Sequence, residues 1–202
     1  MTFDDGPSYL TRQILDILDE ENIKATFFVV SANENTKRAY NGGHTIGLHS
    51  STHKYSYIYS NSETYFKDLT DISNKVYNVV GIRSNIIRFP GGSSNTVSKK
   101  YCKGIMSYLT SEVLNRGYIY FDWNIDSNDA GRDINNSQNI YYNVVNNLSH
   151  NKTNVVLMHD SANHKATVKA LKDIIHYGKN NGYTFKAITL DTPVVIHGVN
   201  NW

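Results

Sequence analysis

The strongest constraint on the fold is the alternation of short apolar segments with longer segments of helical period. Ala25–Val30 is apolar nearly throughout, which is typical of a strand buried on both faces of a parallel sheet. Repeated strand–helix units of this kind predict a parallel sheet covered by helices. The expected strands are Met1–Asp4, Ala25–Val30, His44–Leu48, Ile86–Phe89, Tyr118–Trp123, Asn154–Met158 and Thr184–Ile188. The expected helices are Tyr9–Glu21, Asn33–Tyr40, Ser62–Val80, Thr96–Arg116, Ser137–Leu148 and Lys165–Asn180, with Ile125–Ala130 as a loop.

About seven such units fit into the chain, one fewer than in the standard eight-fold barrel. We therefore expect an α/β fold, a distorted TIM-like (β/α)7 barrel with parallel strands. No linker or repeat divides the 202 residues, so residues 1–202 are expected to form a single domain. A barrel strand runs about five residues, yet only three residues precede Asp4. Either the first strand is short, or the chain is a fragment truncated at that strand.

Polar side chains that suit a metal ion follow two of the expected strands. Asp4 and Asp5 end the first strand at a Gly-Pro break, and a turn there can bring both carboxylates to one rim. His49 and His53 supply two imidazoles just after the third strand. One Asp and two His form a ligand set for zinc or a similar divalent ion, with positions left for water and substrate. The alternative for Asp4 and Asp5 is an ordinary surface turn. The alternative for His49 and His53 is that the two histidines occur together by chance.

Further polar residues fall at the ends of other expected strands. Arg88, Asp126 and His159 join the acids and imidazoles in this position. The carboxyl ends of parallel barrel strands share one rim, where active sites are built, so the pattern predicts an active site there. Arg88 has an ordinary salt bridge as its alternative role. Asp126 has a turn role as its alternative, because Asp122 and Asp129 are close and one acid could substitute for another.

Composition excludes several classes of protein. Hydrophobic residues make up 40% and charged residues 19%, which is typical of a globular chain. The net charge of +2, without a run of Lys or Arg, argues against a nucleic-acid partner. The apolar runs are too short for a membrane span, and no signal peptide is visible. Cys102 is the single cysteine, which excludes an intrachain disulfide and a Cys-rich zinc site.

Five short motifs occur in one order and are spread over most of the chain. They are Thr2–Pro7, His49–His53, Arg88–Gly92, Asp122–Asp126 and Leu157–His159. In this order they resemble the motifs of the polysaccharide deacetylases of carbohydrate esterase family four, the NodB-homology domain. Within that family the chain looks most similar to peptidoglycan N-acetylglucosamine deacetylases.

The resemblance implies a metal-dependent hydrolase that removes N-acetyl groups from N-acetylglucosamine units of a cell-wall polysaccharide, with peptidoglycan as the first expectation. By similarity, Asp5, His49 and His53 would be the metal ligands. Zinc is the expected divalent ion, and cobalt is the alternative. The family also implies an extracytoplasmic location, secreted or at the cell surface. The sequence does not indicate an oligomeric state.

The resemblance also assigns the acid–base roles. Asp4 would be the general base with Arg88 as its partner, and His159 would be the general acid. Asp126 would orient His159 and raise its pKa. Base and acid would then have opposite electrostatic partners, which is how one site performs both proton transfers at one pH.

The substrate side of the site is expected to be formed by three further residues. The backbone N–H of Gly91 can help to hold an oxyanion. Trp123 and Leu157 are candidates to line a groove for the acetyl methyl group, with simple core packing as the alternative. Many relatives carry a bulky aromatic residue where Gly91 stands, so its absence suggests a more open groove.

Three tyrosines follow the second motif, at positions 55, 57 and 59. They are candidates for contact with sugar, although a surface or packing role is favoured for each. Two other functions stay open as alternatives to the N-deacetylase. One is removal of O-acetyl groups from acetylxylan by the same fold. The other is a glycan-binding module without turnover, and a complete set of motif residues argues against it.

Overall fold

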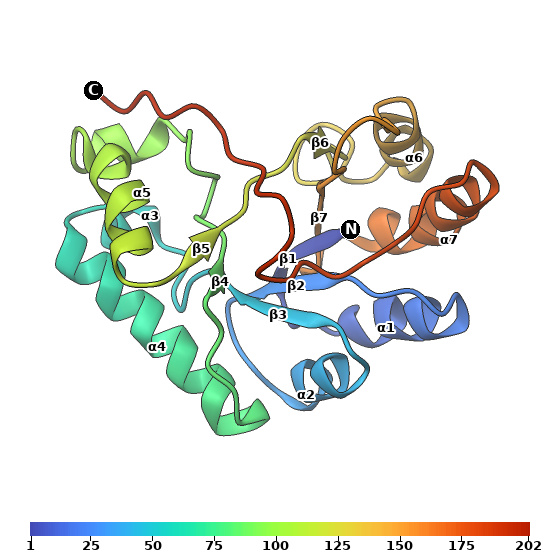
Figure 1. The fold of residues 1–202 in the computed structure, drawn as a ribbon, viewed down its shortest axis with the longest axis horizontal. Helices are drawn as coiled ribbons and strands as arrows, with labels where there is room; N and C mark the ends of the chain where they lie inside the picture. The colour runs from blue at the N-terminus through green and yellow to red at the C-terminus, as the bar shows by residue number, and fades with distance from the viewer.

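The computed structural model describes residues 1–202, and its seven strands form one sheet in which every pairing is parallel. The strands are β1 (Thr2–Gly6), β2 (Thr26–Val29), β3 (Thr45–Leu48), β4 (Ile86–Ile87), β5 (Ile119–Tyr120), β6 (Ile125–Asp126) and β7 (Val156–His159). Their spatial order is β5-β4-β3-β2-β1-β7-β6. The sheet curls into a half-barrel with the helices on its outside (Figure 1). The predicted distorted (β/α)7 barrel is confirmed.

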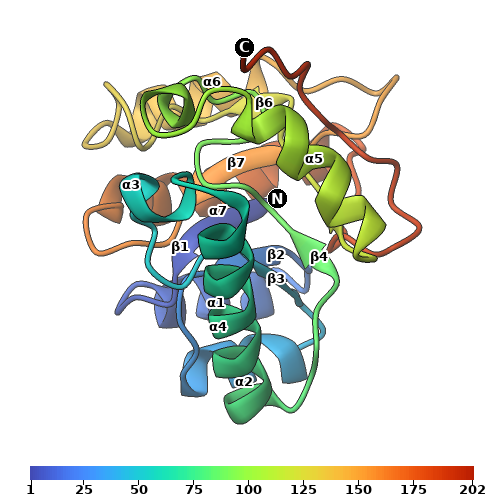
Figure 2. The same ribbon diagram turned by 90° about the vertical axis from the view of Figure 1, so that its left-hand side faces the viewer.

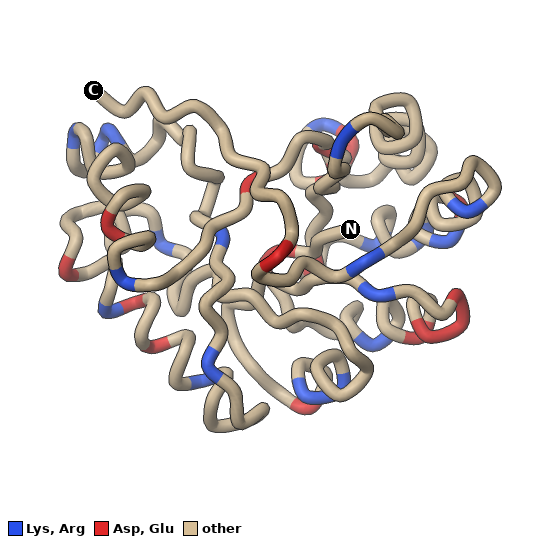
Figure 3. Tube along the Cα trace, in the orientation of Figure 1, with Lys and Arg blue, Asp and Glu red and all other residues tan.

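The helices wrap the convex face of the sheet, and the view at right angles shows the sheet between them (Figure 2). They are α1 (Thr11–Glu20), α2 (Glu34–Asn41), α3 (Tyr55–Ile58), α4 (Ser62–Val80), α5 (Ile105–Asn115), α6 (Ser137–Val145) and α7 (Lys165–Asn180), with one 3-10 turn at Val97–Lys100. No helix combines the length and apolarity that a membrane crossing requires. Lys or Arg and Asp or Glu are interspersed along the helices (Figure 3).

Side-chain alternation along the strands divides the apolar core into two parts. The larger cluster packs the outer face of the sheet against the helices and includes Phe3 and Phe27. The smaller cluster fills the concave side of the sheet and consists of Phe28, Ile86, Phe121, Val155 and Ile188. The concave side of the half-barrel is therefore filled by a packed apolar cluster.

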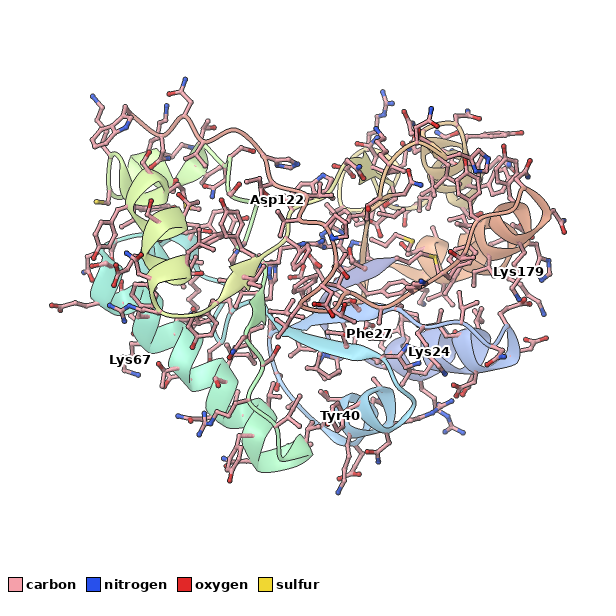
Figure 4. All side chains as sticks on the ribbon, in the orientation of Figure 1. Lys24, Phe27, Tyr40, Lys67, Asp122 and Lys179 are labelled. Carbon is pink, nitrogen blue, oxygen red and sulfur yellow. The ribbon has the colours of Figure 1, made fainter.

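The half-barrel is open between β5 and β6, the two ends of the sheet. The segment after α7 crosses this opening (Figure 1). Val195 O accepts a hydrogen bond from Asp122 N at 2.8 Å, and His197 N donates to Asp122 Oδ2 at 2.8 Å. Asp122 lies at the point where this segment meets the end of β5 (Figure 4). The C-terminal segment thus covers the gap that strand pairing leaves.

The prediction of a last strand at Thr184–Ile188 is wrong. Ile188 N donates to Thr26 Oγ1 at 2.8 Å, and Ile188 O accepts from Thr45 Oγ1 at 2.6 Å. Both hydroxyls belong to residues on the concave faces of β2 and β3. The segment therefore passes beneath neighbouring strands and bonds to their side chains, instead of lying beside one strand and pairing with its backbone.

The seventh strand comes from a segment that was expected to be a loop. Within Ile125–Ala130, Ile125 and Asp126 form β6, which pairs with β7. The Asn124 side chain supports this pairing, because Asn124 Oδ1 accepts from Val155 N at 2.8 Å. Of the expected strand Tyr118–Trp123, only the two residues of β5 pair with β4. The chain then turns away from β4, and Asp122 bonds to the C-terminal segment.

Two helical regions also differ from expectation. The expected helix Thr96–Arg116 is interrupted, because Gly104 adopts a left-handed φ of 81° and α5 begins only after it. The four-residue helix α3 was not predicted, since it is too short to show helical periodicity.

Candidate active site

The carboxyl ends of β1, β3, β4 and β7 bring most of the expected site residues together. The register of β1 and β7 places Asp4 opposite His159. Asp5 follows on the same strand, and its Oδ1 atom faces the loop after β3. The shared rim predicted from the order of strands and polar residues is therefore present.

Asp5, His49 and His53 form a compact cluster. Asp5 Oδ1 lies 3.5 Å from His49 Nε2 and 3.3 Å from His53 Nε2. This oxygen is buried and has no hydrogen-bond partner, although buried polar atoms are normally paired. A divalent cation bound by all three side chains would satisfy it, so the donor set fits a zinc-type ion.

His49 is held in the protonation state that a metal ligand needs. Its Nδ1 lies 2.7 Å from the carbonyl oxygen of Arg88. A carbonyl only accepts, so Nδ1 carries the proton and the lone pair of Nε2 faces Asp5. Burial lowers the pKa of His49 and so favours the neutral ring.

Two members of the cluster adopt strained backbone conformations. Asp5 has a φ of 71° and His53 a φ of 51°, both in the left-handed region that non-glycine residues rarely occupy. Such conformations persist where surrounding contacts enforce them. Asp160 N donates to Asp4 O at 2.7 Å, and Ser50 Oγ accepts from His53 N at 2.8 Å. The turns that present the Asp5 and His53 side chains are thus fixed by neighbouring groups.

Asp68 on α4 holds the loop that carries the two histidines. Its buried carboxylate accepts from Ser50 Oγ at 2.6 Å, Ser51 N at 2.7 Å and Thr52 N at 3.0 Å. Sequence reasoning missed this residue. The available signal was its position, because an acid three residues after Tyr65 lies on the apolar face of the helix.

Arg88 pairs with Asp4 at the centre of the rim. Its side chain is fully buried, and Nη1 donates to Asp4 Oδ1 at 2.8 Å and to Thr2 Oγ1 at 2.7 Å. Nε and Nη2 donate to the carbonyl oxygens of Phe121 and Asp122, each at 2.8 Å. Every edge of the guanidinium is therefore bonded. The other Asp4 oxygen, Oδ2, lies 3.9 Å from His49 Nε2 and faces the cluster.

The expectation that Asp126 orients His159 is wrong, because Asp129 takes that position. Asp129 Oδ1 lies 2.7 Å from His159 Nδ1, and Asp129 Oδ2 accepts from His159 N at 2.8 Å. Asp126 is exposed and accepts only from Asn128 N, at 2.8 Å. Asn128 has a left-handed φ of 57°, and this turn directs the chain back so that Asp129 meets His159.

The Asp129 pair sets the charge of both partners. Burial acts to lower the pKa of His159, but the hydrogen bond and charge of Asp129 outweigh it and raise this pKa to about 9. Burial acts to raise the pKa of Asp129, but hydrogen bonds from His159 and Thr167 lower it below its usual value. His159 is therefore a cation at neutral pH. The ring of His164 stacks on it at 5.1 Å.

Asp129, His159 and His164 also offer closely spaced ligand atoms. Asp129 and His159 already bond to each other in this group, so it is described better as a histidine–carboxylate pair than as a second metal centre.

The expected groove residues lie on two sides of the rim. Gly91 is exposed with a φ of 76°, and the adjacent Gly92 packs so closely that a Cβ there would lie 2.9 Å from the Trp123 ring. Leu157 is 5% exposed and belongs to neither apolar cluster. It is two residues before His159 on β7 and so shares its face of the strand. Trp123 thus packs against the residue next to Gly91, while Leu157 lies on the same face of β7 as His159.

Comparison with known proteins places this chain in a class of hydrolases, the deacetylases. Residues 1–105 match the family model described as polysaccharide deacetylase. The chain belongs to this family, the NodB-type domains of carbohydrate esterase family four.

Individual relatives agree with this assignment. The catalytic domain of a peptidoglycan N-acetylglucosamine deacetylase from Eubacterium rectale superposes with a TM-score of 0.94 at 42% identity, covering 99% of this chain and 92% of that one. A peptidoglycan-N-acetylglucosamine deacetylase of Bacillus cereus is 33% identical over 93% of this chain and 67% of that protein. A bifunctional xylanase/deacetylase of Pseudobutyrivibrio xylanivorans is 30% identical over 99% of this chain but only 31% of that protein.

Proposed function

We propose that this chain is a metal-dependent hydrolase that removes N-acetyl groups from N-acetylglucosamine units of a cell-wall polysaccharide, with peptidoglycan as the first candidate. The unpartnered oxygen of Asp5 between two imidazole nitrogens carries the proposal. The names of the Eubacterium rectale and Bacillus cereus relatives support the substrate. A peptidoglycan substrate would place the reaction outside the cytoplasmic membrane.

Asp5, His49 and His53 would hold the divalent ion, with zinc as the first candidate and cobalt as the second. When bound, such an ion lowers the pKa of water and polarises a carbonyl group. Asp4 is the base that takes the proton of the attacking water, since its Oδ2 faces the cluster. Arg88, bonded to Asp4 Oδ1 at 2.8 Å, keeps that carboxylate ionised and in place.

His159 completes the reaction by donating its proton to the leaving nitrogen. The water oxygen forms a bond to the acetyl carbon, the C–N bond breaks, and the products are acetate and the free amine. A pKa of about 9 means that His159 carries its proton at neutral pH. Gly91 N–H is the candidate to stabilise the developing oxyanion, and Trp123 and Leu157 are candidates to surround the acetyl methyl.

The test is acetate release from chitopentaose by chelator-treated protein, with and without added zinc. We expect release only after zinc is added. Absence of release from protein shown by titration to hold zinc would contradict the proposed reaction. Release of equal size without metal would contradict the role of the Asp5 cluster.

Asp68 is not part of the Asp5–His49–His53 cluster, but its hydrogen bonds to the loop that carries His49 and His53 predict an indirect effect on metal affinity. We expect Asp68→Ala to weaken zinc binding about 10- to 100-fold, because the loop that carries His49 and His53 loses its support. The matched control is Asp71→Ala on the same helix, which removes an exposed acid paired with Lys67. Zinc titration of both variants below their unfolding temperatures measures the effect. Equal affinity of the two variants would contradict it.

One relative favours a second candidate function, removal of O-acetyl groups from xylan, because its name joins xylanase and deacetylase activities. Acetate release from chitopentaose and from acetylated xylan under the same conditions separates the two. A glycan-binding module without turnover is the remaining alternative. In that case the parent protein and the Asp4→Asn variant would bind the polysaccharide equally well, and neither would release acetate.

A further inference from the structure

The side chain of Tyr55 occupies the space that a side chain at position 91 would fill. A Cβ built on Gly91 would lie 2.7 Å from Tyr55 Oη. The Tyr55 ring also lies against the His53 ring, with centroids 5.6 Å apart. The phenol therefore extends from the Asp5–His49–His53 cluster to the Gly91 backbone, along one wall of the site.

The neighbouring tyrosines differ from Tyr55 in their surroundings. Tyr59 is fully buried, and its hydroxyl donates to Pro90 O at 2.7 Å. Tyr57, like Tyr55, is half-buried and packs against the core that lies under the helices, but the ring that contacts His53 is that of Tyr55. Residues two apart on a helix face different directions, so Tyr57 does not share the Tyr55 wall. Tyr59 secures the Pro90–Gly91 loop, which leaves the hydroxyl of Tyr55 as the one directed at Gly91.

We propose that Tyr55 Oη donates a hydrogen bond to the carbonyl oxygen of the bound acetyl group, beside the Gly91 N–H. This role rests on the proposed deacetylase function. As negative charge develops, this oxygen becomes an oxyanion with three lone pairs, so it can accept from both groups and still be polarised by a bound ion. The small residue at position 91 is what makes room for the phenol. Tyr55 is thus a catalytic residue contributed by the segment after β3.

The test compares Tyr55→Phe with the matched control Tyr57→Phe, both loaded with zinc. Loss of one oxyanion donor lowers kcat about 10²-fold, and KM for chitopentaose is expected to change by less than about threefold, since the contact strengthens in the transition state. Tyr57→Phe keeps the parent values. The affinity for zinc and the unfolding temperature show whether either variant has lost its metal or its fold.

Binding of acetate gives a readout independent of turnover. Its carboxylate presents oxygens to the same donors, so we expect Tyr55→Phe to bind acetate about tenfold more weakly. A higher KM with unchanged kcat would overturn the proposal, because it indicates a ground-state contact with a sugar hydroxyl. If Tyr55→Phe left both kcat and acetate affinity unchanged, the proposal would be overturned, because Tyr55 would then have only a packing role. An inactive parent protein would instead overturn the deacetylase function on which the role depends.

Discussion

Asp4→Asn is expected to lower the rate of acetate release about 10³- to 10⁴-fold, the upper part of the range for loss of a general base. The amide preserves the size of the side chain but does not take a proton from water. Asp4 is not among the three residues of the candidate metal cluster. Zinc affinity should therefore stay close to that of the parent protein, and this separates loss of the base from loss of the ion.

The same substitution is expected to destabilise the fold. Arg88 is fully buried, and Asp4 is the carboxylate within 4.0 Å of its guanidinium. Removing one partner of a buried ion pair leaves an uncompensated charge and costs about 3 to 5 kcal/mol. Three neutral oxygens still accept from Arg88, which favours the lower end. Chemical denaturation of parent and variant measures this difference in the free energy of unfolding.

Asp122→Asn is the control for Asp4→Asn, since Asp122 is also fully buried and bonded. Its carboxylate accepts from Ser93 and from His197 N and does not face the cluster. This variant should lose stability but keep most of its rate. A rate in Asp4→Asn above about a tenth of the parent rate would assign the proton transfer to another group. Loss of zinc from Asp4→Asn would make Asp4 a ligand.

The central strands were predictable because each is a run of buried residues with its own local signal. β2 and β7 lie within their expected ranges Ala25–Val30 and Asn154–Met158 to within one residue. The two-residue strands β5 and β6 carry no such signal, since their pairing depends on where the chain leaves a neighbouring strand. The C-terminal segment was misassigned because its partners are hydroxyls on other strands.

The same division holds at the rim. Asp5, His49 and His53 stand in local motifs, and strand order alone was enough to bring them together. Asp68 and Tyr55 reach the site through contacts between separate elements, which no local pattern specifies. The choice between Asp126 and Asp129 depended on one left-handed residue, Asn128, and an Asn at that position does not by itself indicate such a turn.

Asp129→Asn is expected to lower kcat about 10²- to 10³-fold and to move the alkaline limb of the pH–rate profile to lower pH. In the parent, burial lowers the pKa of His159, but Asp129, with smaller contributions from Asp4 and Asp5, raises it to about 9. His159 therefore stays protonated through neutral pH, and activity is expected to fall as pH rises past that value. Without the carboxylate, burial is the dominant remaining influence, and it lowers the pKa of His159.

Asp126→Asn is the matched control for this effect, because Asp126 is exposed and lies three residues earlier in the same segment. It should leave both kcat and the pH–rate profile unchanged. A shifted profile in Asp126→Asn with a parent-like profile in Asp129→Asn would restore the assignment made from sequence. A uniform loss of rate in Asp129→Asn, with the alkaline limb unmoved, would mean that Asp129 orients the His159 ring without setting its charge. The pH–rate profile therefore separates the two contributions that one hydrogen bond makes.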